Sequence, residues 1–173
     1  MMLNSLSDLL LDQVRDLHNA ETQLVAALPK MAKGATSPEL RQLFSEHLEQ
    51  TREHVERLKR VAELLGAKPT GKTCKAMKGL LEEGKEALGE KGEDSVLDVG
   101  LVAAAQRVEH YEIAAYGTAV ALAQRVGNSK VVALLEKTLG EEKDADRLLS
   151  EVCESRLFEE APVESEEPVK AGR

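Results

Sequence analysis

The sequence predicts an all-α fold built around a bundle of four long helices, and three observations carry this prediction. Ala, Leu, Glu and Lys are plentiful while aromatic residues make up only 2% of the 173 residues, a composition that favours helices over strands. Four stretches repeat apolar residues every three or four positions, as on the core-facing side of a helix. Each stretch is interrupted near its middle by a carboxylate or a histidine. A chain of this length can bury a sizeable core as one domain.

The four stripes indicate one polar layer inside the bundle. They comprise Leu10, Val14, Leu17, Glu21, Leu24, Leu28 and Met31; Leu40, Phe44, His47, Thr51, His54, Leu58, Val61 and Leu65; Leu101, Ala105, Val108, Glu112, Ala115, Ala119 and Leu122; and Val132, Leu135, Leu139, Glu142, Asp146 and Leu149. A buried carboxylate is costly unless it is paired, protonated or bound to a metal. Interruptions at matching heights in all four helices therefore point to one shared site.

The first helix is expected to begin at Ser5 or Ser7 and to run to about Lys33. Ser7 is a candidate N-cap, because its hydroxyl can accept a hydrogen bond from a free backbone N–H of the first turn. Gly34 is a candidate stop, since glycine commonly follows the last helical residue. Pro29 lies inside the pattern, which allows a kink or an early end there.

The second helix is expected after Ser37-Pro38-Glu39 and ends at Gly66. That tripeptide supplies an N-cap, a proline in the first turn and an acid at the positive end of the helix dipole. The connection between the first two helices is short, so they are expected to be antiparallel neighbours. Residues 67–94 contain five glycines and one proline and are expected to form a long crossover with a short helix around Thr73–Leu88.

The third helix is expected to start near Ser95, a good N-cap, and to reach about Val126. Gly127-Asn128-Ser129 forms the next turn, and the fourth helix continues to about Glu154 despite Gly140. Two hairpins joined by one long connection are the topology of ferritin-like four-helix bundles. We therefore divide the chain into a ferritin-like helical bundle at 1–157 and an acidic tail at 158–173, expected to be disordered because it is rich in Glu and contains Pro.

The charge balance excludes some classes of function. The net charge of −8 argues against nucleic acid as a partner. No run of about 18 apolar residues exists that could span a membrane, and the N-terminal residues lack the basic segment of a signal peptide. The two cysteines lie far apart in the sequence, which is typical of reduced thiols. These features predict a cytoplasmic protein.

Hairpin geometry tests the polar layer. With the first turn near Gly34, Glu21 is expected level with residues 48–51. With the second turn near Asn128, Glu112 is expected level with the stretch between Glu142 and Asp146. Both hairpins thus place their interruptions at one height. The candidate ligands of the layer are Glu21, His54, Glu109, Glu112, Glu142 and Asp146, with His47 as the alternative to His54 on the second helix.

The chemistry of this set predicts a metal centre. Five ionised carboxylates in one dry layer would repel one another strongly, and two divalent cations would offset nearly all of that charge. Carboxylate and imidazole donors on facing helices suit a pair of iron or manganese ions. The competing interpretation is that these acids are solvated or salt-bridged, as most acids are, and that His47 is a hydrogen-bonded core histidine.

The third helix is apolar on more than one face, as in 101–105 and 113–115. Such a helix is either central or part of an interface. We expect a homodimer in which this helix or the first hairpin forms the contact.

Five motifs of the chain are distinctive in combination: Ala103–Thr118, Thr138–Asp146, Cys74–Leu80, Ala20-Glu21 and His47–Thr51. Together they resemble the YciE/YciF family of bacterial ferritin-like proteins. The resemblance covers roughly residues 3–153. It implies a ferritin-like four-helix bundle, commonly dimeric, that is linked to bacterial stress responses and has a poorly defined activity.

The wider superfamily implies ligand positions, and this chain departs from two of them. His54 falls on the histidine of the Glu-x-x-His motif in the second ferritin helix, but Thr51 stands where that motif has the metal-bridging glutamate. Glu109 and Glu112 are similar to the third-helix motif of rubrerythrins. The fourth helix offers no histidine three residues after its glutamates. The site is therefore open to being dinuclear, mononuclear, weak or empty.

Two main hypotheses follow. The first is a stress-response protein whose layer binds a di-metal iron or manganese centre, with an oxidase or peroxide-detoxifying role. The alternative is a non-catalytic, dimeric helical stress or interaction protein with a degenerate, metal-free site. An iron-storage cage is a third and weaker hypothesis. The residues leave open whether the protein is an enzyme.

Overall fold

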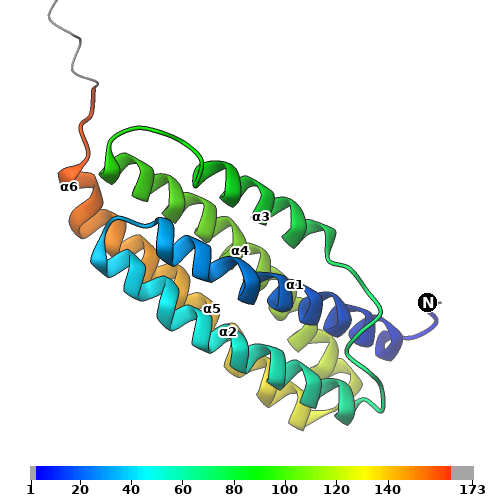
Figure 1. Ribbon diagram of the computed structural model, residues 1–173. Coiled ribbons are helices and arrows are strands. Elements are labelled where there is room, and N and C mark those ends of the chain that lie inside the picture. Colours follow the sequence, from blue (N-terminus) through cyan, green and yellow to red (C-terminus); the bar gives the residue numbers. More distant parts are fainter. Residues whose placement is uncertain (1–2, 165–173) are drawn as a thin grey trace, which may run out of the picture.

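The computed structural model describes residues 3–164, and every regular element within them is helical. Four long helices, α1 (Leu6–Gly34), α2 (Pro38–Leu64), α4 (Asp94–Val126) and α5 (Ser129–Val152), form two antiparallel hairpins (Figure 1). The shorter α3 (Lys75–Ala87) lies in the crossover and packs against α4 and α1. The predicted bundle of two hairpins joined by a long crossover with a short helix is confirmed. No helix within 3–164 is long and apolar enough to cross a membrane.

Helix α1 begins at Leu6, directly after the first of the two predicted starting serines. Ser5, not Ser7, is the N-cap: its Oγ accepts a hydrogen bond from the Asp8 backbone N–H at 3.1 Å. The Asp8 carboxylate in turn accepts from the Ser5 hydroxyl at 2.8 Å, so the first turn is closed from both sides. The helix continues through Pro29 to Gly34, because tertiary packing of its apolar face outweighs the loss of one backbone hydrogen bond.

A buried carboxylate from the second hairpin fixes the turn between α1 and α2. The Asp98 side chain accepts hydrogen bonds from the Thr36 N–H at 2.9 Å, the Thr36 hydroxyl at 2.7 Å and the Ser37 N–H at 2.6 Å. Ser37 then caps α2 through its own hydroxyl. Asp98 therefore ties the two hairpins together at one end of the bundle, a role that the sequence analysis missed.

The boundaries of the second hairpin differ from the prediction at both ends. Helix α4 begins at Asp94 without a side-chain cap, and the predicted cap Ser95 instead donates a hydrogen bond to the Glu160 carbonyl at 3.3 Å. After α5 the chain makes a single π-helical turn, η1 (Cys153–Leu157), and the short α6 (Phe158–Glu160). Helical structure thus extends three residues into the predicted 158–173 tail, and residues 165–173 of that tail lie outside the described residues.

The polar layer separates two apolar core clusters. The α3-side core comprises Ala20, Leu24, Leu28, Met31, Ala35, Leu40, Phe44, Cys74, Met77, Leu101, Val102, Ala105, Val108, Leu149, Cys153 and Leu157. The far core comprises Leu10, Val14, Leu17, Leu58, Val61, Ala62, Tyr116, Ala119, Val120, Ala123, Val131 and Leu135. Helix α3 contributes only to the first cluster, so the two halves of the bundle are built differently.

Candidate metal centre

The four long helices bring six buried side chains together between the two cores. They are Glu21 from α1, His47 and His54 from α2, Glu109 and Glu112 from α4, and Glu142 from α5. The predicted layer therefore exists as a cluster of side chains, and it holds five of the six predicted ligands as well as the alternative histidine.

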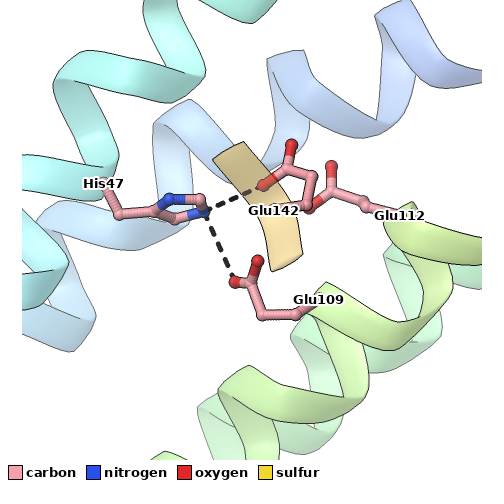
Figure 2. Close-up of side chains that lie close together, drawn as sticks. All are labelled: His47, Glu109, Glu112 and Glu142. Atoms are coloured by element: carbon pink, nitrogen blue, oxygen red, sulfur yellow. Dashed lines mark ion pairs between the residues drawn. The ribbon is translucent and has the colours of Figure 1, made fainter. Parts of the chain in front are cut away.

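The side chains form two compact groups that share one carboxylate. In each group, one potential ligand atom per residue lies within 4.8 Å of all the others. The first group contains His47, Glu109, Glu112 and Glu142 (Figure 2). The second group contains Glu21, His54 and Glu142. Glu142 thus lies between the groups, with Oε1 toward His54 and Oε2 toward His47.

His54 is oriented by Glu141, a carboxylate that lies outside the layer. Its Nδ1 lies 2.9 Å from Glu142 Oε1 and 3.4 Å from Glu21 Oε1, whereas its Nε2 lies 3.0 Å from Glu141 Oε2. Arg57 donates a 2.6 Å hydrogen bond to the same Glu141 oxygen. A proton on Nε2 donated to Glu141 leaves the Nδ1 lone pair directed at Glu21 and Glu142, which is the arrangement that orients metal-binding histidines.

His47 repeats this arrangement two helical turns earlier. Its Nε2 lies 3.4 Å from Glu109 Oε1 and 3.9 Å from Glu142 Oε2 (Figure 2). Its Nδ1 lies 3.3 Å from Gln50 Oε1. A seven-residue spacing returns a helix to the same face, so His47 and His54 both point into the layer. The choice that the sequence left between these two histidines was unnecessary, because each serves a different group.

Burial and the repulsion between like charges raise the pKa values of the carboxyl groups in the layer. Burial and the charge of Glu21 raise the pKa of Glu109 to about 8, and the same causes raise the pKa of Glu112 well above its ordinary value. Burial raises the pKa of Glu142 to about 7, although His54 opposes the shift. Burial lowers the pKa of His54, but the adjacent carboxylates of Glu142 and Glu21 outweigh it and raise the value to about 10.

The donor atoms of the layer fit a pair of divalent cations. Both carboxylate oxygens of Glu112 and Glu142, one oxygen each of Glu21 and Glu109, and the inward nitrogens of the two histidines make no hydrogen bond within the described part of the chain. Buried polar atoms are normally satisfied, so a concentrated set of this kind calls for a ligand. Four carboxylates with neutral imidazoles carry four negative charges, which two divalent cations balance.

Two buried hydroxyls border the layer. Tyr116 donates a short hydrogen bond to Glu21 Oε1 at 2.5 Å, and it follows Glu112 by one helical turn on the same face. The sequence analysis did not include this tyrosine among the site residues, although that spacing was a usable signal. Thr51, which stands where the superfamily has a bridging glutamate, donates to the His47 carbonyl at 2.7 Å within its own helix. Glu142 from α5 occupies the position between the two groups.

Asp146 is the predicted ligand that the structure does not bring into either group. Its Oδ1 accepts a hydrogen bond from Gln106 at 3.1 Å and lies 3.5 Å from His110 Nε2, and its side chain is 23% exposed. The buried stripe of α5 is Val131, Leu135, Thr138, Glu142 and Leu149. Val131 and Thr138 are buried where Val132 and Leu139 were predicted, and a one-residue shift rotates a side chain by about 100°. In the turn after Glu142, Ala145 and Asp146 are both only half-buried.

The register of the hairpins agrees with the prediction for one hairpin and differs for the other. Glu112 and Glu142 share a group, as expected from the turn near Asn128. Glu21 lies beside His54, about one turn beyond the predicted level of residues 48–51. As a result, Glu21 lies close to His54 only. His47 instead faces Glu109 on α4 and Glu142 on α5.

A bundle of two hairpins that encloses a carboxylate and histidine layer defines the class of ferritin-like proteins. The model of the family described as domain of unknown function (DUF892) matches residues 5–161, and the chain belongs to this family. It is 38% identical over 162 residues to Protein YciF of Escherichia coli strain K12, an alignment that covers 93% of this chain and 98% of YciF. The resemblance to YciE/YciF proteins is thereby confirmed.

Solved structures agree with this assignment. The E. coli stress protein YciF superposes with a TM-score of 0.86 over 90% of this chain and 98% of YciF. YcfI, described as a putative structural protein from Rhodopseudomonas palustris, is 45% identical with a TM-score of 0.83 over 86% of this chain and 94% of its own. A ferritin-like, diiron-carboxylate protein of Bacillus anthracis shares the fold, with a TM-score of 0.67 over 87% of this chain and 99% of its own at 15% identity.

Proposed function

We propose that this protein holds two divalent cations, iron or manganese, in the buried layer and uses them in a bacterial stress response. The observation that carries the proposal is the position of Glu142, whose carboxylate belongs to both ligand groups. A carboxylate that faces two groups of donors is suited to bridge two ions. A histidine nitrogen completes each group, and each histidine is oriented through its other ring nitrogen.

The donor chemistry favours iron or manganese over other cations. Carboxylate oxygens with one imidazole nitrogen per ion suit these metals, whereas a softer metal would be better served by thiolates, which neither group contains. Bound iron or manganese would supply one-electron redox chemistry. The chain's own residues hold the ions, exclude bulk water by their burial and keep a proton on the Tyr116 hydroxyl beside Glu21.

The biological context of the proposal comes from a relative. The E. coli protein, to which this chain is 38% identical, is called a stress protein. A redox-active centre in such a protein supports an oxidase or peroxide-detoxifying role. Turnover is a further step beyond metal binding, and the two are tested separately.

Metal titration tests the proposal. Metal-free protein titrated anaerobically with ferrous iron, or with manganese, is expected to bind two ions per chain, measured by calorimetry and by metal analysis after gel filtration. Glu142→Gln is expected to lower the binding affinity for both ions, because that carboxylate belongs to both groups. Glu21→Gln is expected to lower the binding affinity for only one ion. Glu136→Gln, an exposed position on α5, is the matched control and should bind like the wild type.

A second candidate function is a non-catalytic helical stress protein with a metal-free layer. Thr51 favours it, since this residue brings no carboxylate to the position that the superfamily uses for bridging. The raised pKa values of Glu109, Glu112 and Glu142 also favour it, because shared protons can satisfy a metal-free layer. This candidate predicts that Glu21→Gln combined with Glu112→Gln leaves stress protection intact. Loss of protection in a double variant that still folds would count against it.

A further inference from the structure

An apolar pocket of about 360 Å³ lies in the α3-side half of the bundle. Residues from α1, α2, α3, α4 and α5 line its walls, and those from α3 include Leu80, Leu81 and Lys85. The walls are mainly leucines and alanines, together with Met31, Phe44 and Val108. A volume of this size is in the range of small-molecule sites.

The pocket reaches the polar layer. Of the six residues in the layer, only His47 and Glu109 line the pocket, and only these two retain exposed surface, at 7% and 3%. Glu21, His54 and Glu142 are 0% exposed. The inward Nε2 of His47 and Oε2 of Glu109 are also among the buried atoms without a hydrogen-bond partner in residues 3–164. The layer therefore opens toward solvent through an apolar passage, at these two side chains.

The mouth of the pocket is cationic. Its exposed charged residues are Lys30 from α1, Lys85 from α3 and Glu46 from α2. Neither lysine forms an ion pair with any residue in the described part of the chain, so both ammonium groups are available to a bound anion. An apolar cavity below two unpaired ammonium groups is complementary to a molecule with a hydrocarbon body and an anionic head.

We infer that this pocket binds an unbranched aliphatic monocarboxylate. The chain lies between α3 and the bundle, the carboxylate lies beside Lys30 and Lys85, and the methyl end faces His47 and Glu109. Binding in the pocket is independent of metal. The further assignment, that the aliphatic chain is the molecule presented to the metal centre, rests on the proposed function.

Methionine NMR tests occupancy of the pocket. Met31 lines the pocket, whereas Met77 is equally part of the α3-side core but does not line it. Titration of metal-free protein carrying 13C-methyl methionine with dodecanoate, below its micelle concentration, should shift the Met31 methyl in a saturable manner and leave Met77 nearly unchanged. Across alkanoates from octanoate to dodecanoate, affinity should rise about fourfold per added methylene while the pocket accepts the chain. Absence of saturable binding, or equal shifts at both methyl groups, would overturn the inference.

Two sets of variants test the site and the orientation. Ala27→Phe places a ring in the pocket and should weaken dodecanoate binding more than tenfold, whereas Ala114→Phe, on the exposed face of α4, should leave it unchanged. Lys30→Glu combined with Lys85→Glu should weaken dodecanoate about tenfold but leave dodecanol within twofold. Equal effects on the acid and the alcohol would overturn the cationic mouth as the head-group site.

The outcome separates this inference from the proposed function. Manganese-loaded protein should bind dodecanoate, and the paramagnetic ions should broaden the signals from the methyl end of the chain more than those next to the carboxylate. Two bound ions without dodecanoate binding would overturn the pocket inference and leave the metal centre standing. Dodecanoate binding by a protein that binds no metal would sustain the pocket and overturn the proposed function. Stronger broadening at the carboxylate end would contradict the orientation.

Discussion

The two halves of the core share the same helices but differ in how completely they are closed. In the far core, four helices pack on one another, and Leu17, Leu58 and Leu135 have at most 1% of their surface exposed. In the α3-side core a fifth helix lies over the bundle, its half-buried Leu80 and Leu81 line the pocket, and the layer opens there. The far core thus holds the bundle together, while the α3 side gives access to the layer.

Leucine truncation in each half is the strongest test of this comparison. Leu17→Ala in the far core is expected to reduce the free energy of unfolding by about 3 kcal/mol, because it removes a fully packed side chain and leaves a cavity. Leu80→Ala on the α3 side borders an existing pocket and is expected to cost about 1 kcal/mol. Urea unfolding followed by circular dichroism measures both. Equal losses of unfolding free energy in the two variants would contradict the claim that the far core is closed and the α3-side core is open.

Asp98 is the next largest expected effect, since it ties the hairpins together at the α3-side end. Asp98→Ala removes the acceptor for two backbone N–H groups and a hydroxyl, and is expected to cost about 2 kcal/mol. Asp94→Ala, an exposed acid four residues earlier on the same helix, is the control and should cost about 0.5 kcal/mol. A loss at Asp98 no larger than at Asp94 would show that the turn is held by packing alone.

The layer between the two halves adds a dependence on pH that neither apolar core has. The pKa values of Glu109 and Glu142 are raised to about 8 and about 7, so the folded metal-free protein binds more protons than the unfolded chain. The stability that these two carboxyl groups contribute is therefore fully present below about pH 4.5 and is lost as pH rises to about 8. His54, with its pKa raised to about 10, acts in the same direction above pH 6.5.

Thermal unfolding of metal-free protein should accordingly show a melting temperature that falls steadily between pH 5 and pH 8, because over this range only the folded state still holds protons on Glu109 and Glu142. Loading with manganese should remove most of this decrease, because the cations replace the protons. A metal-free protein that grows more stable over this range would show that the four carboxylates do not share a dry layer.

Tyr116 closes the far core against the layer and has the smallest expected effect. Tyr116→Phe removes the hydrogen bond to Glu21 while keeping the buried ring, and is expected to lower stability by about 1 kcal/mol. Metal stoichiometry should stay at two, since this tyrosine belongs to neither ligand group. Loss of an ion in this variant would place the hydroxyl among the ligands.

Periodicity predicted the fold because each long helix buries one face along its whole length. The same stripes brought Glu21, His54, Glu112 and Glu142 to the layer correctly. They failed where the exact rotation of a helix matters: Asp146 is half-buried and lies beside exposed His110 instead of joining either ligand group. The rotation of a helix about its axis is set by its packing against neighbouring helices, and the spacing of residues along one helix does not determine that packing.

Contacts between distant parts of the chain were beyond prediction for a different reason. Asp98 accepts from residues about 60 positions away, and the pocket combines residues from five helices. No local spacing reports on such encounters. The cap of α4 was mistaken because Ser95 found a distant partner in Glu160. The homodimer and the cytoplasmic location stay predictions.

Anomalous scattering from crystals of the manganese-loaded protein tests the central claim most directly. The account predicts two peaks per chain on either side of the Glu142 carboxylate, one beside Glu21 and His54 and the other among His47, Glu109 and Glu112. Both peaks should weaken together in Glu142→Gln. A fully folded protein with no anomalous peak in the layer would contradict the account.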